Sequence, residues 1–268
     1  SEMVRRSCLG EAVDRVTAVP RNNVAGLDLD MYNDLIYGIA CIPCQSAVMF
    51  RIVEGRWIPA CAGKSGQIGG IVVYDIPKVK LGNSDIEVTR FMSGGNPLCG
   101  NAHFTKEMGD DMREYFTAEQ VVKFLHEVQA HGINTLQARG DFHRVLHWRE
   151  LFMREGGKLH FIAQTASEMF DLFSNIRVIA AAGAEAIYHH GSRTDNLWLD
   201  GRIDKVEDHL KCMRDTGVQV GIASHIPEVL DYVEDKGWDV DFYMTCFYNL
   251  NKAKRESALV DPFNAGAL

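Results

Sequence analysis

The sequence predicts an α/β fold, a TIM-type (β/α) barrel that is incomplete at its C-terminus and preceded by an N-terminal extension. From residue 79 onward, six short apolar segments alternate with amphipathic helical segments. The short segments are mostly apolar throughout, which is typical of parallel strands covered by helices. The first strand–helix turn carries no Gly-x-Gly-x-x-Gly motif, and this favours a barrel over a doubly wound sheet.

The segment 79–97 predicts a β-hairpin followed by the first buried strand. Apolar residues alternate with polar ones on both sides of the turn sequence Gly-Asn-Ser-Asp at positions 82–85. Phe91 and Met92 then lead into Gly94 and Gly95, which end the strand and allow a close approach of backbone or ligand. This hairpin sets the register in which the later strands are assigned.

The remaining elements follow from capping signals and periodicity. The Thr-Ala-Glu-Gln sequence at 117–120 is a capping box, and apolar residues repeat after it at helical spacing until Gly132. Pro227 lies in the first turn of the last helix. The predicted strands are residues 90–93, 133–138, 159–165, 186–190, 218–224 and 240–246. The other predicted helices are residues 145–154, 168–182, 204–216 and 228–236.

Six strands do not close a barrel, which needs eight. Few residues follow Leu250, whereas two further strand–helix units need roughly 50 residues. The chain is therefore truncated, or the barrel is open, or the first segment supplies strands, and 47–53 and 67–74 look like strands. We divide the chain into an N-terminal extension of unknown fold, residues 1–76, and a barrel, residues 77–268.

Composition excludes several classes of function. The net charge of −8 gives no electrostatic footprint for nucleic acid, and no apolar run reaches the roughly 20 residues that span a bilayer. The arginines near the start are not followed by the apolar segment of a signal peptide. The odd set of seven cysteines favours reduced thiols, hence a cytoplasmic protein. An open barrel exposes strand edges, which predicts a homo-oligomer.

Polar residues follow all six predicted strands. The carboxyl ends of parallel barrel strands meet at one mouth, where reactive residues gather, so a substrate cleft is expected there. Loops are polar in any case, so the same residues also fit simple solvation. The predicted contacts with a small-molecule substrate are Asn96, His103, Gln137, His143, Gln164, His225, Tyr248 and Asn249.

Three residues of this mouth are the predicted catalytic group. His190 is the candidate general acid–base, because imidazole titrates near neutral pH. Asp141 and Arg139 would orient it, or would hold an anionic or hydroxylated substrate. The alternative for Arg139 and Asp141 is a mutual surface ion pair, which contributes little to stability.

A divalent metal is a competing interpretation of the same histidines. His143, His189 and His225, with Asp141 nearby, provide the imidazole and carboxylate groups that suit Zn, Mn or Fe. Such sets polarise a hydroxyl or a carbonyl in isomerases and hydrolases. Neighbouring strand residues point in opposite directions, however, so His189 and His190 cannot both face the interior unless the strand has ended. The sequence contains no His-Glu-x-x-His motif.

Over about residues 77–250 the chain resembles the aldo/keto reductase superfamily, nearest to a divergent bacterial branch of it. The hairpin resembles the one that plugs the barrel floor in that family, and Gly132-Ile133-Asn134 resembles the start of its second strand. The segments 221–224 and 248–250 resemble its Gly-Val-Ser-Asn and Tyr-Asn-Leu strand endings. His190 occupies the place of the family's histidine after the fourth strand.

Three other catalytic positions depart from the family. Gln137 stands where the family has Asp, Phe142 where it has Tyr, and Thr165 where it has Lys. Phe142 has no proton to donate, and ketone reduction needs an acid whose pKa a Lys–Asp pair lowers. The NADPH that the resemblance implies is therefore not supported by these positions.

The sequence thus predicts an enzyme, an oxidoreductase-like barrel whose reductase site is largely lost. It would act on a small polar substrate, a sugar or a hydroxy-carbonyl compound, by acid–base chemistry centred on His190. Two alternatives stay open: a metal-dependent isomerase or hydrolase, and a non-catalytic binding or assembly module.

Overall fold

The fold is taken from a computed structural model. It describes residues 38–41, 50–53, 56–59, 65–68, 71–101, 106–141, 143–166 and 171–245, with side chains from Tyr74 onward. The predicted site residues His103, Tyr248 and Asn249, and also Phe142, lie outside these ranges.

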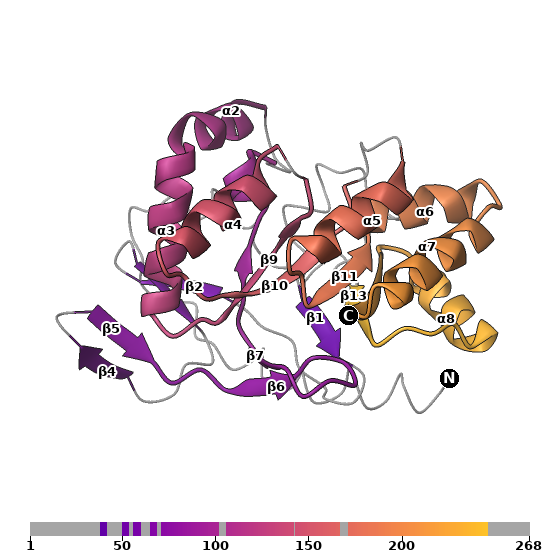
Figure 1. The fold of residues 1–268 in the computed structure, drawn as a ribbon, viewed down its shortest axis with the longest axis horizontal. Helices are drawn as coiled ribbons and strands as arrows, with labels where there is room; N and C mark the ends of the chain where they lie inside the picture. Colours follow the sequence, from indigo (N-terminus) through magenta and orange to yellow (C-terminus); the bar gives the residue numbers. More distant parts are fainter. Residues whose placement is uncertain are drawn as a thin grey trace, which may run out of the picture.

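Six parallel strands form one curled sheet, a half-barrel flanked by helices (Figure 1). Their order in space is their order along the chain, as expected when every crossover has the same hand. The antiparallel strand β1 (Gly38–Cys41) extends this sheet at β13, so the first part of the chain supplies one edge strand. The parallel strands are β8 (Ser93–Gly94), β9 (Thr135–Arg139), β10 (His160–Gln164), β11 (Ala186–His189), β12 (Gln219–Ser224) and β13 (Phe242–Thr245).

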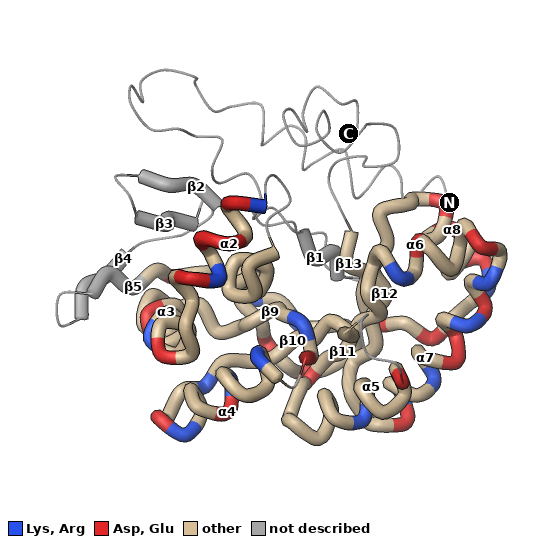
Figure 2. The backbone as a smooth tube through the Cα atoms, turned by 90° about the horizontal axis from the view of Figure 1, so that it is seen from above, with Lys and Arg blue, Asp and Glu red and all other residues tan. Residues whose placement is uncertain are grey.

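The helices lie around the outer face of the sheet, as an arc in the view from above (Figure 2). The main hydrophobic core fills the space between them, and it contains Phe161, Ile187 and Ile222 from the strands and Leu125 and Ile176 from the helices. The helices are α2 (Lys106–Tyr115), α3 (Ala118–Ala130), α4 (Val145–Arg154), α5 (Leu172–Ala181), α6 (Gly191–Leu199), α7 (Asp204–Asp215) and α8 (Pro227–Lys236), with the 3₁₀ turn η2 (Pro97–Cys99) after β8.

The inner face of the sheet is covered by the hairpin of β6 (Lys78–Lys80) and β7 (Glu87–Thr89), which confirms the predicted hairpin. Leu81 and Val88 from the hairpin form a second core with Ile162, Tyr188 and Phe242 from the strands. All five side chains are at most 1% exposed. A sheet whose two faces are both buried explains why its strands are apolar throughout.

Most predicted elements are confirmed within one or two residues. The predicted helix 168–182 begins only at Leu172, after the N-cap Asp171, and its residues 168–170 lie outside the described ranges. Arg90 still donates its backbone N–H to Pro77 (2.8 Å), so the chain leaves the hairpin late and joins the sheet only at β8. The predicted strand 67–74 is two strands, β4 (Ser65–Ile68) and β5 (Ile71–Tyr74), which pair with each other around a Gly-Gly sequence. The predicted strand 47–53 corresponds to β2 (Phe50–Val53), which pairs with β3 (Arg56–Pro59). Helices α2 and α6 were not predicted.

Within the described ranges, no helix is both long enough and apolar enough to cross a lipid bilayer.

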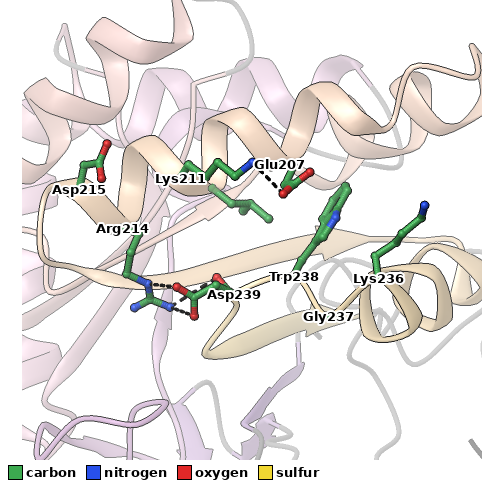
Figure 3. Close-up of a pocket in the computed structure, with 9 residues that line it drawn as sticks. Glu207, Lys211, Arg214, Asp215, Lys236, Gly237, Trp238 and Asp239 are labelled. Carbon is green, nitrogen blue, oxygen red and sulfur yellow. Dashed lines mark hydrogen bonds and ion pairs between the residues drawn. The ribbon is translucent and has the colours of Figure 1, made fainter.

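A cavity of about 360 Å³ lies between α7 and the loop that leads from α8 into β13 (Figure 3). Its walls contain two ion pairs: Lys211 bonds Glu207 (2.8 Å), and Arg214 bonds Asp239 (2.7 Å). Arg214 and Asp239 lie shortly before β12 and β13, near the amino ends of these strands. The lining residues are Glu207, Leu210, Lys211, Arg214, Asp215, Lys236, Gly237, Trp238 and Asp239.

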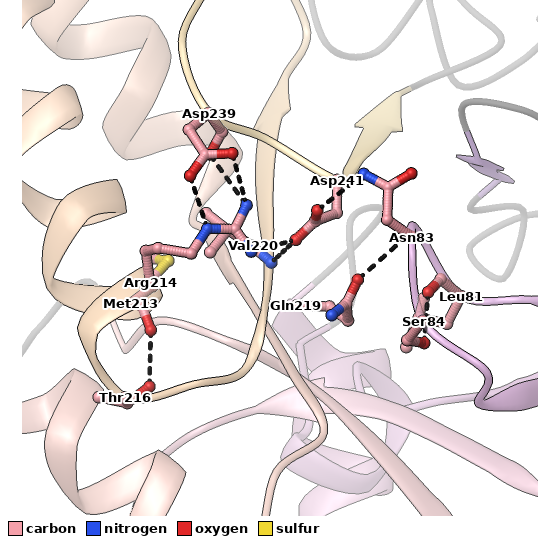
Figure 4. Close-up of polar contacts among 10 residues, drawn as sticks. All are labelled: Leu81, Asn83, Ser84, Met213, Arg214, Thr216, Gln219, Val220, Asp239 and Asp241. Atoms are coloured by element: carbon pink, nitrogen blue, oxygen red, sulfur yellow. Dashed lines mark hydrogen bonds and ion pairs between the residues drawn. The ribbon is translucent and has the colours of Figure 1, made fainter.

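Asp241, directly before β13, fastens the hairpin to the floor of the half-barrel (Figure 4). Its side chain is 5% exposed and accepts hydrogen bonds from Val220 N (2.7 Å), Arg214 Nη1 (2.8 Å) and Asn83 Nδ2 (3.2 Å). The turn fits closely, because a Cβ added at Gly82 would lie 2.6 Å from the Cβ of Asp241. One buried carboxylate therefore joins the hairpin turn, two strands and α7.

We predict that Asp241→Ala lowers the free energy of unfolding by about 1–3 kcal/mol, because it leaves the buried backbone N–H of Val220 without its acceptor. Asp239→Ala is the matched control, since Asp239 bonds the same arginine but its side chain is 75% exposed. That change should cost less than about 1 kcal/mol. Urea denaturation measures both, and equal losses would show that Asp241 holds no special place in the fold.

Candidate functional site

The carboxyl ends of β9, β10 and β11 carry polar side chains on the inner face of the sheet. Arg139, Gln164 and Tyr188 occupy one row of the strand register. Tyr188 belongs to the inner core, and its hydroxyl accepts a short hydrogen bond from the amide of Gln137. Arg139 lies two residues further along the same strand, hence on the same side as Gln137. Part of the predicted polar mouth is thus brought together.

His190 lies at the point where β11 ends and α6 begins. Its backbone N–H donates to Thr165 Oγ1 (3.0 Å), and Thr165 itself is fully buried. The imidazole is partly exposed, but its buried Nδ1 has no hydrogen-bond partner among the described residues. Burial lowers the pKa of His190 to about 4, and the positive charge of Arg139 adds to this effect. The ring is therefore neutral at neutral pH.

His225 and Asp195 form a close pair beside His190. His225 Nδ1 lies 2.5 Å from Asp195 Oδ2, and the two side chains are 21% and 14% exposed. The other carboxylate oxygen, Oδ1, accepts from Ser224 Oγ (2.6 Å) and from the backbone N–H of His225 (3.1 Å). Asp195 is thus held by three hydrogen bonds from the end of β12, and it fixes the orientation of the imidazole.

Asp195 lies in α6, a helix that the sequence does not predict. A carboxylate in the first turns of a surface helix is not distinguishable in sequence from a solvated one. The only available signal was its position soon after a predicted strand, and the histidine that it bonds is 30 residues further along the chain.

The side chain of Asp141 hydrogen-bonds the start of α4. Its carboxylate accepts from the backbone N–H groups of Arg144 (2.9 Å) and Val145 (3.2 Å), and from Arg144 Nη2 (3.1 Å). Arg139 Nε lies 3.9 Å from the same carboxylate. The side chains of Arg139 and Asp141 are only 16% and 6% exposed, so the alternative of a surface ion pair does not describe them. Burial lowers the pKa of Arg139, and Asp141 partly offsets this.

Three of the other predicted site residues, Asn96, Gln164 and His143, lie at the end of β10 or in the segments that follow β8 and β9. Asn96 is partly buried, and its backbone carbonyl accepts from Cys99 N (3.1 Å) at the η2 turn. Gln164 is half-buried and accepts from Gly140 N through its backbone carbonyl (2.7 Å). His143 is exposed, just before α4.

His189 points away from the mouth, as the alternation of strand side chains requires. It is fully buried on the outer face, where it bonds Thr194 Oγ1 through Nδ1 (2.8 Å) and stacks on His209 of α7 with ring centroids 5.2 Å apart. The metal set His143, His189 and His225 is therefore not brought together. Within the described part of the chain, no group of three or more His, Cys, Asp or Glu side chains is placed to hold a metal ion.

No protein-family model matches the chain, and a search of curated proteins finds no match either. The resemblance to aldo/keto reductases therefore stays a prediction that depends on the residues quoted above.

The buried histidines predict that stability falls as the pH drops. Burial lowers the pKa of His189, His190 and His209 below the ordinary value of 6.5. Below pH 6.5 the unfolded chain therefore binds protons that the folded chain does not, and each group costs up to about 1.4 kcal/mol per pH unit. We expect the contribution of these histidines to the free energy of unfolding to be complete above pH 6.5. The free energy of unfolding should therefore decline toward pH 5 in urea titrations. His190→Gln should make this decline shallower, and an unchanged slope would contradict the lowered pKa of His190.

Proposed function

We propose that the chain is a divergent TIM-type (β/α) barrel of the aldo/keto reductase kind and an enzyme for a small polar substrate. The substrate is a sugar or another hydroxy-carbonyl compound, and the reaction is acid–base catalysis at the carboxyl ends of the strands. The polar row of Arg139, Gln164 and Tyr188 supports this location, since reactive groups of parallel barrels lie at that end.

The observation that carries the proposal is the state of His190. A neutral imidazole has one donor and one acceptor nitrogen, so it can hydrogen-bond a carbonyl or a hydroxyl and exchange a proton with it. The buried Nδ1 has no partner in the described structure, although a buried polar atom is usually satisfied. Burial, together with the nearby charge of Arg139, keeps the ring neutral, and Arg139 offers a positive charge to an oxyanion.

Reductase chemistry is not part of the proposal. The side chains at two of the family's catalytic positions have other tasks, because Gln137 bonds Tyr188 and Thr165 holds the backbone of His190. Neither residue can lower the pKa of a phenol, so the described residues do not fit the family's proton donor, and we derive no hydride step.

The test is turnover of hydroxyaldehydes, hydroxyketones and simple sugars, followed by proton NMR. We expect the wild-type protein to convert at least one of them, and His190→Gln to lower kcat by about 10²–10⁴, the usual contribution of a positioned acid–base group. His147→Gln, at an exposed position on α4, is the matched control and should leave the rate unchanged. No conversion by the wild type, or full activity of His190→Gln, would refute the proposal.

A further inference from the structure

We infer that Asp195 and His225 form the proton-accepting pair of this site, and that the reaction is enolisation of a hydroxy-carbonyl substrate, as in aldose–ketose isomerisation. The inference rests on the proposed function, and it adds a base, a proton path and a reaction class to it.

The hydrogen bonds of Asp195 determine which nitrogen of His225 can act. An ionised carboxylate only accepts hydrogen bonds, so the 2.5 Å contact places the proton of the ring on Nδ1. The lone pair then belongs to Nε2, and the carboxylate stabilises the imidazolium that forms when Nε2 takes a proton. Because Ser224 Oγ and the His225 backbone N–H hold Oδ1, the carboxylate cannot turn away from the ring.

The fold brings this pair to His190 through two neighbouring strands. Asp195 belongs to α6, which begins directly after His190, and His225 follows the last residue of β12, which pairs with β11. A Cβ added at Gly191 would lie 3.2 Å from Cε1 of His225, so the second ring packs against the backbone next to His190. A side chain at position 191 would crowd this ring.

The two histidines then divide the chemistry between them. Nε2 of His225 takes the proton from the carbon next to the substrate carbonyl, and the C–H electron pair forms a carbon–carbon double bond. The carbonyl π electrons move to oxygen, which takes a proton from neutral His190, with Arg139 stabilising the negative charge that develops. The return of the proton from His225 to the former carbonyl carbon, and of a hydroxyl proton to His190, gives the isomer and restores both rings. No oxidant, reductant or co-reactant is consumed.

A purely structural role for Asp195 is the competing explanation. The bonds to Ser224 and to the His225 backbone would by themselves join α6 to the end of β12. A structural aspartate would affect only stability. A proton-accepting Asp195–His225 pair must also control the tautomer of the His225 ring and the exchange of carbon-bound protons of the substrate.

The test is proton–deuterium exchange at the carbons next to the carbonyl of hydroxyacetone, dihydroxyacetone and glyceraldehyde, followed by proton NMR in D₂O. The wild-type protein should catalyse exchange into at least one of these probes. Asp195→Asn and His225→Gln should each slow it by about 10²–10⁴. Asp200→Asn, at an exposed position at the end of the same helix, is the matched control and should exchange at the wild-type rate.

A second readout needs no turnover. Long-range proton–nitrogen NMR should show His225 protonated on Nδ1 in the wild type, and on Nε2 in Asp195→Asn, because the new amide can donate to Nδ1. Urea denaturation of each variant separates loss of folding from loss of chemistry. If Asp195→Asn does not fold, the exchange rate of His225→Gln tests the inference.

The possible outcomes separate this inference from the proposed function. If His190→Gln abolishes conversion while Asp195→Asn and His225→Gln keep the wild-type exchange rate, the inference is wrong and the proposed function stands. If the wild type converts a substrate without exchanging any of the three probes, the enolisation is wrong and another acid–base reaction remains. If it neither converts nor exchanges anything, both are wrong.

Discussion

The burial of the inner face of the curled sheet is the constraint on which the rest of the structure depends. An open parallel sheet exposes an apolar inner surface unless another element covers it. The β6–β7 hairpin does so through Leu81 and Val88, and Asp241 fastens its turn by hydrogen bonds to Asn83, Val220 and Arg214. A buried carboxylate is costly to desolvate, and here three donors offset that cost at the floor of the half-barrel.

This arrangement separates stability from chemistry along the strands. The amino ends carry the closely packed hairpin and the paired charges around the α7–α8 cavity. The carboxyl ends carry His190, whose Nδ1 has no hydrogen-bond partner within the described part of the chain. Between them, Gly221 leaves room for the ring of Phe242, which would lie 2.4 Å from an added Cβ, and Phe242 in turn packs edge-on against Tyr188. The inner face of the sheet is thus apolar toward the amino ends of the strands and polar toward their carboxyl ends.

The site could be predicted in part, and the missing part has a definite cause. His190 and Arg139 were found because polar residues that directly follow apolar strands stand out, and the carboxyl ends of parallel strands share one edge. Asp195 was not found, because its relation to His225 exists only after α6 has packed against β12. Asp141 was expected to orient His190 or to hold a substrate. Its carboxylate instead accepts hydrogen bonds from backbone N–H groups at the start of α4.

By itself, the sequence determined the alternation of strands and helices, the hairpin and the alternation that sends His189 and His190 to opposite faces. These features depend on local periodicity, capping and turn chemistry, which act over a few residues. Only the tertiary structure decided which polar side chains meet: the Asp195–His225 pair and the stacking of His189 on His209. It also decided that Nδ1 of His190 has no partner among the residues described. Those contacts join residues on different elements, and their distances depend on how the helices and strands pack together.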